Sequence, residues 1–262
     1  MPTLDLPDCK LHYIIDDHTD AWTNPETVLF VHGFTECTEA WRAWVPHFSR
    51  RYRMIRIDQR GFGQSTPVPK DYPLDTARYV ADLVAIIKSI GNGRVHVVGG
   101  KSGGISVLSL AAQHPELVNT ITVSCSPVTP PNADGWIPEM ERDGVRSWAL
   151  RTQRERMGSS MPQAGIDWWS DMMGRTPMST VYAYMRWVSG IDIREDIKKI
   201  QCPVLVIGTD TARRGRGIFE SWQKTIPHSE LAILPIDGYH AAGTDPDRTA
   251  AVALDFIARR ST

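Results

Sequence analysis

The sequence predicts an α/β fold, with a mostly parallel central β-sheet, helices on both faces and a helical insertion. Short apolar runs rich in Val and Ile alternate with amphipathic stretches of helical period, as expected when helices join the strands of a parallel sheet. The chain has 262 residues, of which 42% are hydrophobic and 23% charged. A single α/β core with an insertion therefore suits this length and composition.

Six apolar runs are predicted to be strands buried on both faces, because they are continuous rather than alternating. In chain order they are 27–33, 52–58, 95–100, 120–126, 203–209 and 230–236. The amino-terminal segment 4–17 alternates more and predicts an antiparallel hairpin at the edge of the sheet.

Three stretches are predicted to be amphipathic helices that cover the sheet, at 76–91, 104–116 and 247–260. In the first, apolar residues recur at helical spacing and therefore share one face. These residues are Val80, Leu83, Val84 and Ile87. Gly91 then provides a stop signal for that helix.

The segment 127–190 has helical periodicity, no strand-like run and many Trp, Met and Arg residues. We expect it to form a lid over the carboxyl ends of the strands, inserted between two core segments, 1–126 and 191–262. Most of its aromatic side chains are expected to form the lid's own core. Four of its residues are predicted to form a pliable apolar wall of the substrate pocket: Trp168, Trp169, Met172 and Met173.

The net charge of −1 gives no reason to expect nucleic acid or an anionic membrane as a partner. The amino terminus lacks the pattern of a secretion signal, and no apolar run approaches the roughly 18 residues of a membrane span. Four widely spaced cysteines without a CxxC pair make a disulfide framework or a zinc site unexpected. We therefore expect a cytoplasmic protein without a metal.

One serine has a setting typical of a nucleophile. Residues 100–104 read Gly-Lys-Ser-Gly-Gly and match G-x-S-x-G between a predicted strand and a predicted helix. A sharp turn there requires small neighbours, and the amino terminus of the helix leaves N–H groups free to face negative charge. We predict that Ser102 is held in a strained conformation as the nucleophile; the alternative is a glycine-rich turn with an idle serine.

With this motif in place, the chain resembles the α/β-hydrolase fold superfamily over nearly its whole length. His32-Gly33-Phe34 resembles the oxyanion-loop motif of that superfamily, and DQRGFGQS (58–65) resembles the loop after the next strand. The resemblance implies that the backbone N–H groups of Phe34 and Gly103 form an oxyanion hole. It also implies that His32 supports its loop by hydrogen bonding. The superfamily likewise implies a small-molecule substrate and a monomer or a homodimer.

A serine hydroxyl needs a base to react at neutral pH. His240 follows the last predicted strand and matches the superfamily order of nucleophile, acid and histidine. Asp210 is the predicted acid, although the carboxylate stands one residue earlier than in most relatives. Asp134 and Asp237 are the alternatives; Asp237 also suits a role within its turn.

The resemblance implies hydrolysis of a carboxylic ester or lactone with a small or medium, apolar or aromatic group. The reaction would pass through an acyl-enzyme and need no cofactor. A serine at 102 argues against dehalogenases and epoxide hydrolases, which need an aspartate there. Cleavage of a carbon–carbon bond beside a ketone, cofactor-free perhydrolysis and a non-catalytic binding role stay open.

Two basic features are not explained by this function. Arg213, Arg214 and Arg216 follow Asp210, and we interpret them as a solvated loop in preference to a site for a substrate carboxylate. Lys101 directly precedes Ser102, and a surface ion pair is favoured for its side chain over the alternative, an ammonium that helps to stabilise the oxyanion.

Overall fold

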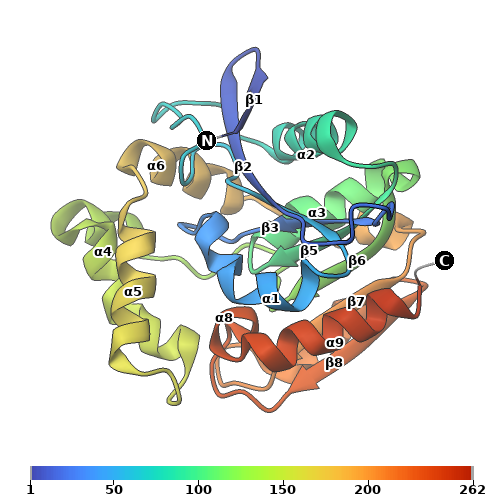
Figure 1. The fold of residues 1–262 in the computed structure, drawn as a ribbon. Coiled ribbons are helices and arrows are strands. Elements are labelled where there is room, and N and C mark those ends of the chain that lie inside the picture. Colours follow the sequence, from blue (N-terminus) through green and yellow to red (C-terminus); the bar gives the residue numbers. More distant parts are fainter. Residues whose placement is uncertain (1, 261–262) are drawn as a thin grey trace.

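The computed structural model describes residues 2–260, which form one eight-stranded sheet covered by helices (Figure 1). The strands are β1 (Thr3–Leu6), β2 (Cys9–Asp16), β3 (Thr27–Val31), β4 (Arg53–Ile57), β5 (Val95–Gly100), β6 (Val118–Ser124), β7 (Val204–Thr209) and β8 (Ser229–Leu234). Their order in the sheet is β1-β2-β4-β3-β5-β6-β7-β8. β2 pairs antiparallel with β1 and β4, and all other neighbours are parallel. The predicted fold class and the predicted hairpin are thus confirmed.

The central strands form where the sequence has continuous β-branched and aliphatic residues. Every residue of β3, β5 and β7 is buried, as expected of strands covered on both faces. Each of the six predicted strands agrees with the structure to within two residues at either end.

The helices lie on both faces of the sheet, with α2 (Thr76–Ile90) and α3 (Gly103–Gln113) on one face and α1 (Val45–Phe48) and α9 (Pro246–Ala258) on the other (Figure 1). The Asp75 carboxylate caps α2 by accepting the Arg78 N–H at 2.7 Å. Such a cap satisfies one of the free N–H groups at a helix start. Two short helices, α7 (Arg216–Gln223) and α8 (Ala241–Thr244), complete the core.

The segment 127–190 contains no strand and three helices, α4 (Trp136–Met157), α5 (Gln163–Gly174) and α6 (Met178–Val188). The three helices stand together at one side of the sheet (Figure 1). Gly144 interrupts α4 with a φ of 83°, which glycine adopts without steric cost. Met140 and Trp148 of α4 are buried, so part of the apolar content of this segment forms its own core.

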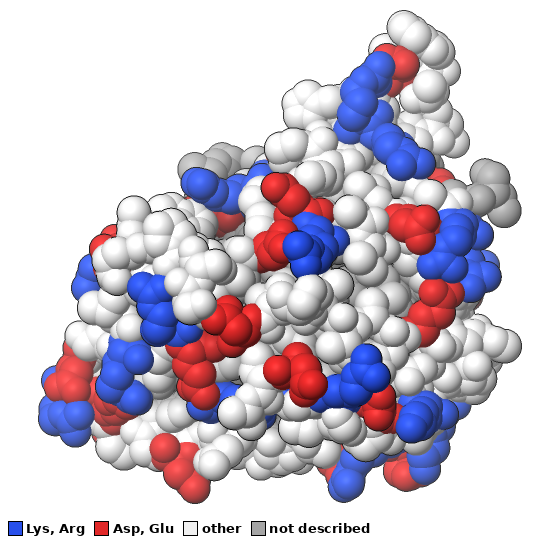
Figure 2. Space-filling model, turned by 90° about the horizontal axis from the view of Figure 1, so that it is seen from below, with Lys and Arg blue, Asp and Glu red and all other residues white. Residues whose placement is uncertain are grey.

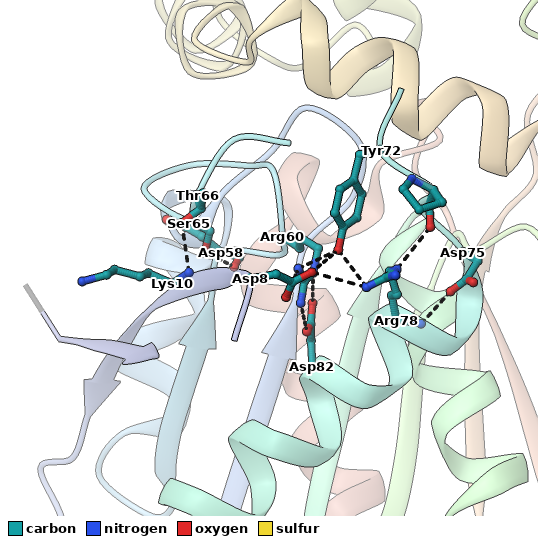
Figure 3. Close-up of polar contacts among 11 residues, drawn as sticks. Asp8, Lys10, Asp58, Arg60, Ser65, Thr66, Tyr72, Asp75, Arg78 and Asp82 are labelled. Carbon is teal, nitrogen blue, oxygen red and sulfur yellow. Dashed lines mark hydrogen bonds and ion pairs between the residues drawn. The ribbon is translucent and has the colours of Figure 1, made fainter. Parts of the chain in front are cut away.

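A polar network, buried at Asp58, Arg60 and Asp82, anchors the loop that follows β4 (Figure 3). Arg60 forms ion pairs with Asp82 at 2.7 Å and with Asp8 at 2.8 Å. Asp58 accepts hydrogen bonds from the Thr38 N–H at 2.6 Å and from His12 at 2.8 Å. Because these contacts join segments far apart in the sequence, they hold the loops at the carboxyl ends of β3 and β4 in place.

The surface is mixed in charge. Acidic and basic side chains are interspersed over the face in Figure 2, in keeping with the small net charge. None of the helices within residues 2–260 is long and apolar enough to cross a membrane. All four cysteines are buried free thiols.

Candidate active site

The turn between β5 and α3 is tight, and its strained residue is Lys101. Lys101 has a φ of 54°, whereas Ser102 has an ordinary helical φ of −69° and stands directly before α3. The prediction that Ser102 holds the strained conformation was therefore wrong. The chain reverses one residue earlier, so the apex of the turn is Lys101, flanked by Gly99-Gly100 and by Ser102-Gly103. A non-glycine residue at positive φ costs about 1–3 kcal/mol and is often found at functional sites.

The turn packs against the loop after β3, and two glycines allow this contact. A Cβ atom on Gly103 would lie 2.2 Å from the His32 carbonyl oxygen. A Cβ atom on Gly33 would lie 2.8 Å from the Cβ of Lys101. Both distances are too short for any side chain, so glycine at these positions lets the two loops meet.

The loop after β3 presents a backbone donor to Ser102. The Phe34 N–H donates to the Ser102 Oγ at 3.0 Å. His32 braces this loop, because its Nδ1 bonds the Gly33 carbonyl at 2.7 Å and its Nε2 accepts the Gln59 N–H at 2.9 Å. Burial lowers the pKa of His32, which favours the neutral imidazole that these bonds require.

His240 is paired with Glu36. The His240 Nε2 lies 2.8 Å from the Glu36 Oε1, and the two side chains are 4% and 5% exposed. The His240 Nδ1 accepts the Gly243 N–H at 3.1 Å, so the Nε2 carries the proton and donates it to Glu36. The other Glu36 oxygen accepts the Gly33 N–H at 2.9 Å. Glu36 thus joins the imidazole to the loop that carries Phe34.

The Glu36 carboxylate is charged despite its burial. Burial alone would raise the pKa of this carboxyl, but its electrostatic interaction and hydrogen bond with His240, its attraction to Lys101 and the Gly33 N–H together lower it from 4.5 to about 2. The attraction of these groups for the charged form thus outweighs the cost of removing the carboxylate from water.

The contact expected between Asp210 and His240 is absent from the structure. The exposed Asp210 instead accepts the Arg216 N–H at 2.9 Å, at the start of α7. Of the two alternatives, Asp237 accepts the Ser159 N–H at 3.0 Å, and Asp134 is exposed at the rim of the cavity described below. Glu36 was missed because it lies 204 residues from His240 in the chain. Its position in the loop after β3 is the only sequence signal that could have indicated it.

A cavity of about 1170 Å³ opens above the turn. Its wall is mixed, and six of its side chains are aromatic: Phe34, Trp136, Trp148, Tyr184, Trp222 and Tyr239. The segment 127–190 therefore contributes to the cavity, as expected of a lid.

Of the four residues predicted to form the apolar wall, only Met173 lines the cavity. Trp169 packs against the His240 ring at 4.9 Å instead, and Trp168 lies under the Arg42 guanidinium at 4.7 Å. Met172 is buried at 3% exposure. Trp168, Trp169 and Met172 therefore lie on sides of α5 that do not face the cavity. The apolar pattern of the sequence did not show which side of the helix would face it.

Cationic side chains also line the cavity: Lys101, Arg151, Arg156, Arg194, Lys198, Arg213 and Arg214. Arg214 is half-buried and donates to the Cys125 carbonyl at 2.6 Å, so the interpretation of a solvated loop is wrong for this residue. Arg216 is exposed, as expected. Acidic residues line the cavity as well, namely Glu36, Asp134, Glu155, Asp192 and Glu195. Glu155 is paired with Arg213 at 3.1 Å.

Lys101 points into this cavity region and not to the surface. Its Nζ lies 3.9 Å from the centre of the Tyr239 ring, and within residues 2–260 no carboxylate forms an ion pair with it. The expected pairing with a surface acid was therefore wrong.

A mostly parallel sheet with a glycine-rich strand–turn–helix and a buried histidine–carboxylate pair defines an α/β hydrolase. The model of the family described as alpha/beta hydrolase fold matches residues 26–179, and the chain belongs to this family. The chain is 25% identical over 260 residues to a putative carbamate hydrolase of Caulobacter sp. (strain K31), covering 92% of this chain and 93% of that protein. It is 27% identical over 258 residues to the 2-hydroxy-6-oxo-6-(2'-aminophenyl)hexa-2,4-dienoic acid hydrolase of Metapseudomonas resinovorans, covering 90% and 85% of the two chains.

Among solved structures, the enol-lactonase from Burkholderia xenovorans LB400 is similar, with a TM-score of 0.89 and 17% identity. The match covers 98% of this chain and 100% of that structure. At this identity the likeness concerns the fold. The chain is thus a hydrolase of this fold, and its substrate is a separate question.

Proposed function

We propose that this enzyme hydrolyses a carboxylic ester or a lactone whose small or medium, apolar or aromatic body carries an acidic group. The observation that carries the proposal is the Phe34 N–H, 3.0 Å from the Ser102 Oγ at the cavity. A backbone donor at this position can stabilise the negative oxygen that forms when a carbonyl is attacked.

In the proposed mechanism, the Ser102 Oγ attacks the carbonyl carbon and His240 takes the hydroxyl proton. The N–H groups of Phe34 and Gly103 hold the oxyanion, and water then hydrolyses the acyl-enzyme. Glu36 replaces Asp210 as the carboxylate that orients the imidazole. In the structure the His240 Nε2–H donates to Glu36 and the Nδ1 accepts the Gly243 N–H. In this mechanism the Nδ1 therefore releases the Gly243 N–H and takes the serine proton, while the Nε2–H keeps its bond to Glu36.

The cavity supports the choice of substrate. Its aromatic side chains suit an apolar or aromatic body, and the guanidinium groups of Arg156 and Arg214 favour a carboxylate. We propose that the segment 127–190 is the lid that encloses this substrate. The enol-lactonase among the structural neighbours acts, as its name states, on a cyclic ester.

Cleavage of a carbon–carbon bond beside a ketone is the second candidate. Lys101 at the apex of the turn favours it, because an amine can activate a ketone in a way that it cannot activate an ester. One relative of similar length is named as a hydrolase of a 6-oxo dienoic acid.

A fluorophosphonate probe and a substrate panel test the proposal. The panel contains p-nitrophenyl esters with and without a carboxylate, lactones and vinylogous diketones. We expect the probe to label the wild type but not Ser102→Ala, and the best ester or lactone to lose at least about 10³-fold in kcat with Ser102→Ala. Glu36→Gln should lose orders of magnitude, whereas the matched Asp210→Asn should stay within a few-fold. A folded wild type that is neither labelled nor active on any ester or lactone would refute the proposal.

A further inference from the structure

The residue at the apex of the turn, Lys101, carries an inference beyond ester hydrolysis. Thr35, Lys101 and Cys125 are the three non-glycine residues with positive φ within residues 2–260, and they follow β3, β5 and β6. Strain is thus concentrated at the end of the sheet that borders the cavity. Lys101 is the one of the three with a reactive side chain that lines the cavity.

The Lys101 side chain lies in a position that disfavours its charged form. The Glu36 carboxylate nearby already accepts bonds from His240 and the Gly33 N–H. Burial lowers the pKa of Lys101 well below its usual value, and the charges of Arg214 and Arg156 lower it further, against the opposing charge of Glu36. The lowered pKa raises the fraction of Lys101 that is uncharged at a given pH, and the uncharged amine has the free lone pair that a nucleophile requires.

Groups that could bind a carbonyl compound surround this amine. The Nζ lies 3.9 Å from the Tyr239 ring centre, which provides an apolar surface. Arg156 and Arg214 line the same cavity and can hold a carboxylate. An ester is the wrong partner for this amine, because aminolysis would end in a stable amide.

We infer that Lys101 is an amine nucleophile that forms a Schiff base with a ketone or aldehyde bearing a carboxylate. The lone pair of the Nζ attacks the carbonyl carbon, and the nitrogen loses a proton while the oxygen gains one. The resulting carbinolamine takes up a proton and releases the oxygen as water, which leaves an iminium ion and consumes no oxidant or reductant. The iminium withdraws electrons from the adjacent carbon and activates bonds to it. This is a different reaction class from the serine-based ester hydrolysis proposed above.

Reductive trapping tests this inference on the full chain. Phenylpyruvate is incubated with the protein and sodium cyanoborohydride, which reduces an iminium to a secondary amine. We expect one adduct with the mass of phenylpyruvate less one oxygen atom. Because trypsin does not cut after an alkylated lysine, the adduct should appear on the peptide 95–142, which is otherwise cut after Lys101.

Matched variants complete the test. Lys101→Met should lose at least about 90% of the adduct, whereas Lys199→Met, which removes an exposed lysine paired with Asp196, should retain it. Phenylacetone, which lacks the carboxylate, should label the wild type at least several-fold less. Absence of an adduct on 95–142 in the wild type, or equal labelling of Lys101→Met, would overturn the inference. Ester hydrolysis measured on the same wild-type sample separates the two ideas: activity without an adduct rejects only this inference, and an adduct without activity rejects only the proposed function.

Discussion

Replacing Glu36 with glutamine should remove a pH-dependent part of the stability. The pKa of Glu36 is lowered from 4.5 to about 2 in the folded protein, which corresponds to about 3 kcal/mol of stabilisation at neutral pH. A depressed carboxyl pKa means that this stabilisation is fully present above pH 4.5 and is lost as the pH falls toward 2. Glutamine cannot titrate, so Glu36→Gln lacks this contribution at every pH.

The measurement is the difference in unfolding free energy between the wild type and Glu36→Gln, from urea denaturation followed by tryptophan fluorescence between pH 3 and 7. We expect the difference to be constant above pH 5 and to shrink by roughly 1.4 kcal/mol per pH unit below about pH 4.5. Glu39→Gln serves as the control for loss of one charge, because Glu39 forms an exposed ion pair with Arg175 at 2.8 Å. That variant should change stability by less than about 1 kcal/mol.

A wild-type advantage over Glu36→Gln that stays the same from pH 5 to pH 3 would refute the reasoning. It would mean that the carboxyl titrates alike in the folded and unfolded states. The pairing of Glu36 with His240 would then contribute no electrostatic stabilisation.

Two further predictions concern packing and buried charge. Gly103→Ala should lower the free energy of unfolding by about 2–3 kcal/mol, because the new methyl group would lie 2.2 Å from the His32 carbonyl oxygen. Urea denaturation measures this loss. An unchanged denaturation midpoint would show that the two loops do not touch. Arg60→Met should cost about 3–5 kcal/mol by leaving Asp82 buried without its partner. The double variant Arg60→Met with Asp82→Leu should recover most of that loss, and a double variant no more stable than Arg60→Met would contradict this account.

The fold was predictable because its signals are local. Continuous runs such as 203–209 stand out as buried strands, and Gly91 marks a helix end without tertiary information. The sequence predicted where the turn lies but not which residue forms its apex. The glycines at 99, 100, 103 and 104 permit an apex at either Lys101 or Ser102. The backbone dihedral angles identify Lys101 as the apex, and the motif specifies residue types but not those angles.

The partner of His240 was not predictable for a different reason. A carboxylate in a surface loop and one buried against an imidazole look alike in a sequence. Asp210 occupied the expected place along the chain, yet the folded loop turns its carboxylate to the Arg216 N–H. Glu36 follows β3 and His240 follows β8. The two side chains meet only because the carboxyl ends of these parallel strands lie at the same edge of the sheet. The same reason explains why Arg213 and Arg214 border the cavity, whereas nothing in the sequence distinguishes them from a solvated loop.

The glycine contacts around the turn have a consequence for how this site can change over generations. The shape of the turn depends on positions without side chains, above all Gly103 against the His32 carbonyl oxygen and Gly33 against the Lys101 Cβ. The amine of the apex residue, Lys101, lies beyond these contacts, in the cavity and over the Tyr239 ring. Mutation at 101 can therefore alter the chemistry of the enzyme while the scaffold persists, whereas mutation at 103 damages the scaffold first. The shape of the turn and the functional group that it presents to the cavity thus depend on separate, neighbouring positions.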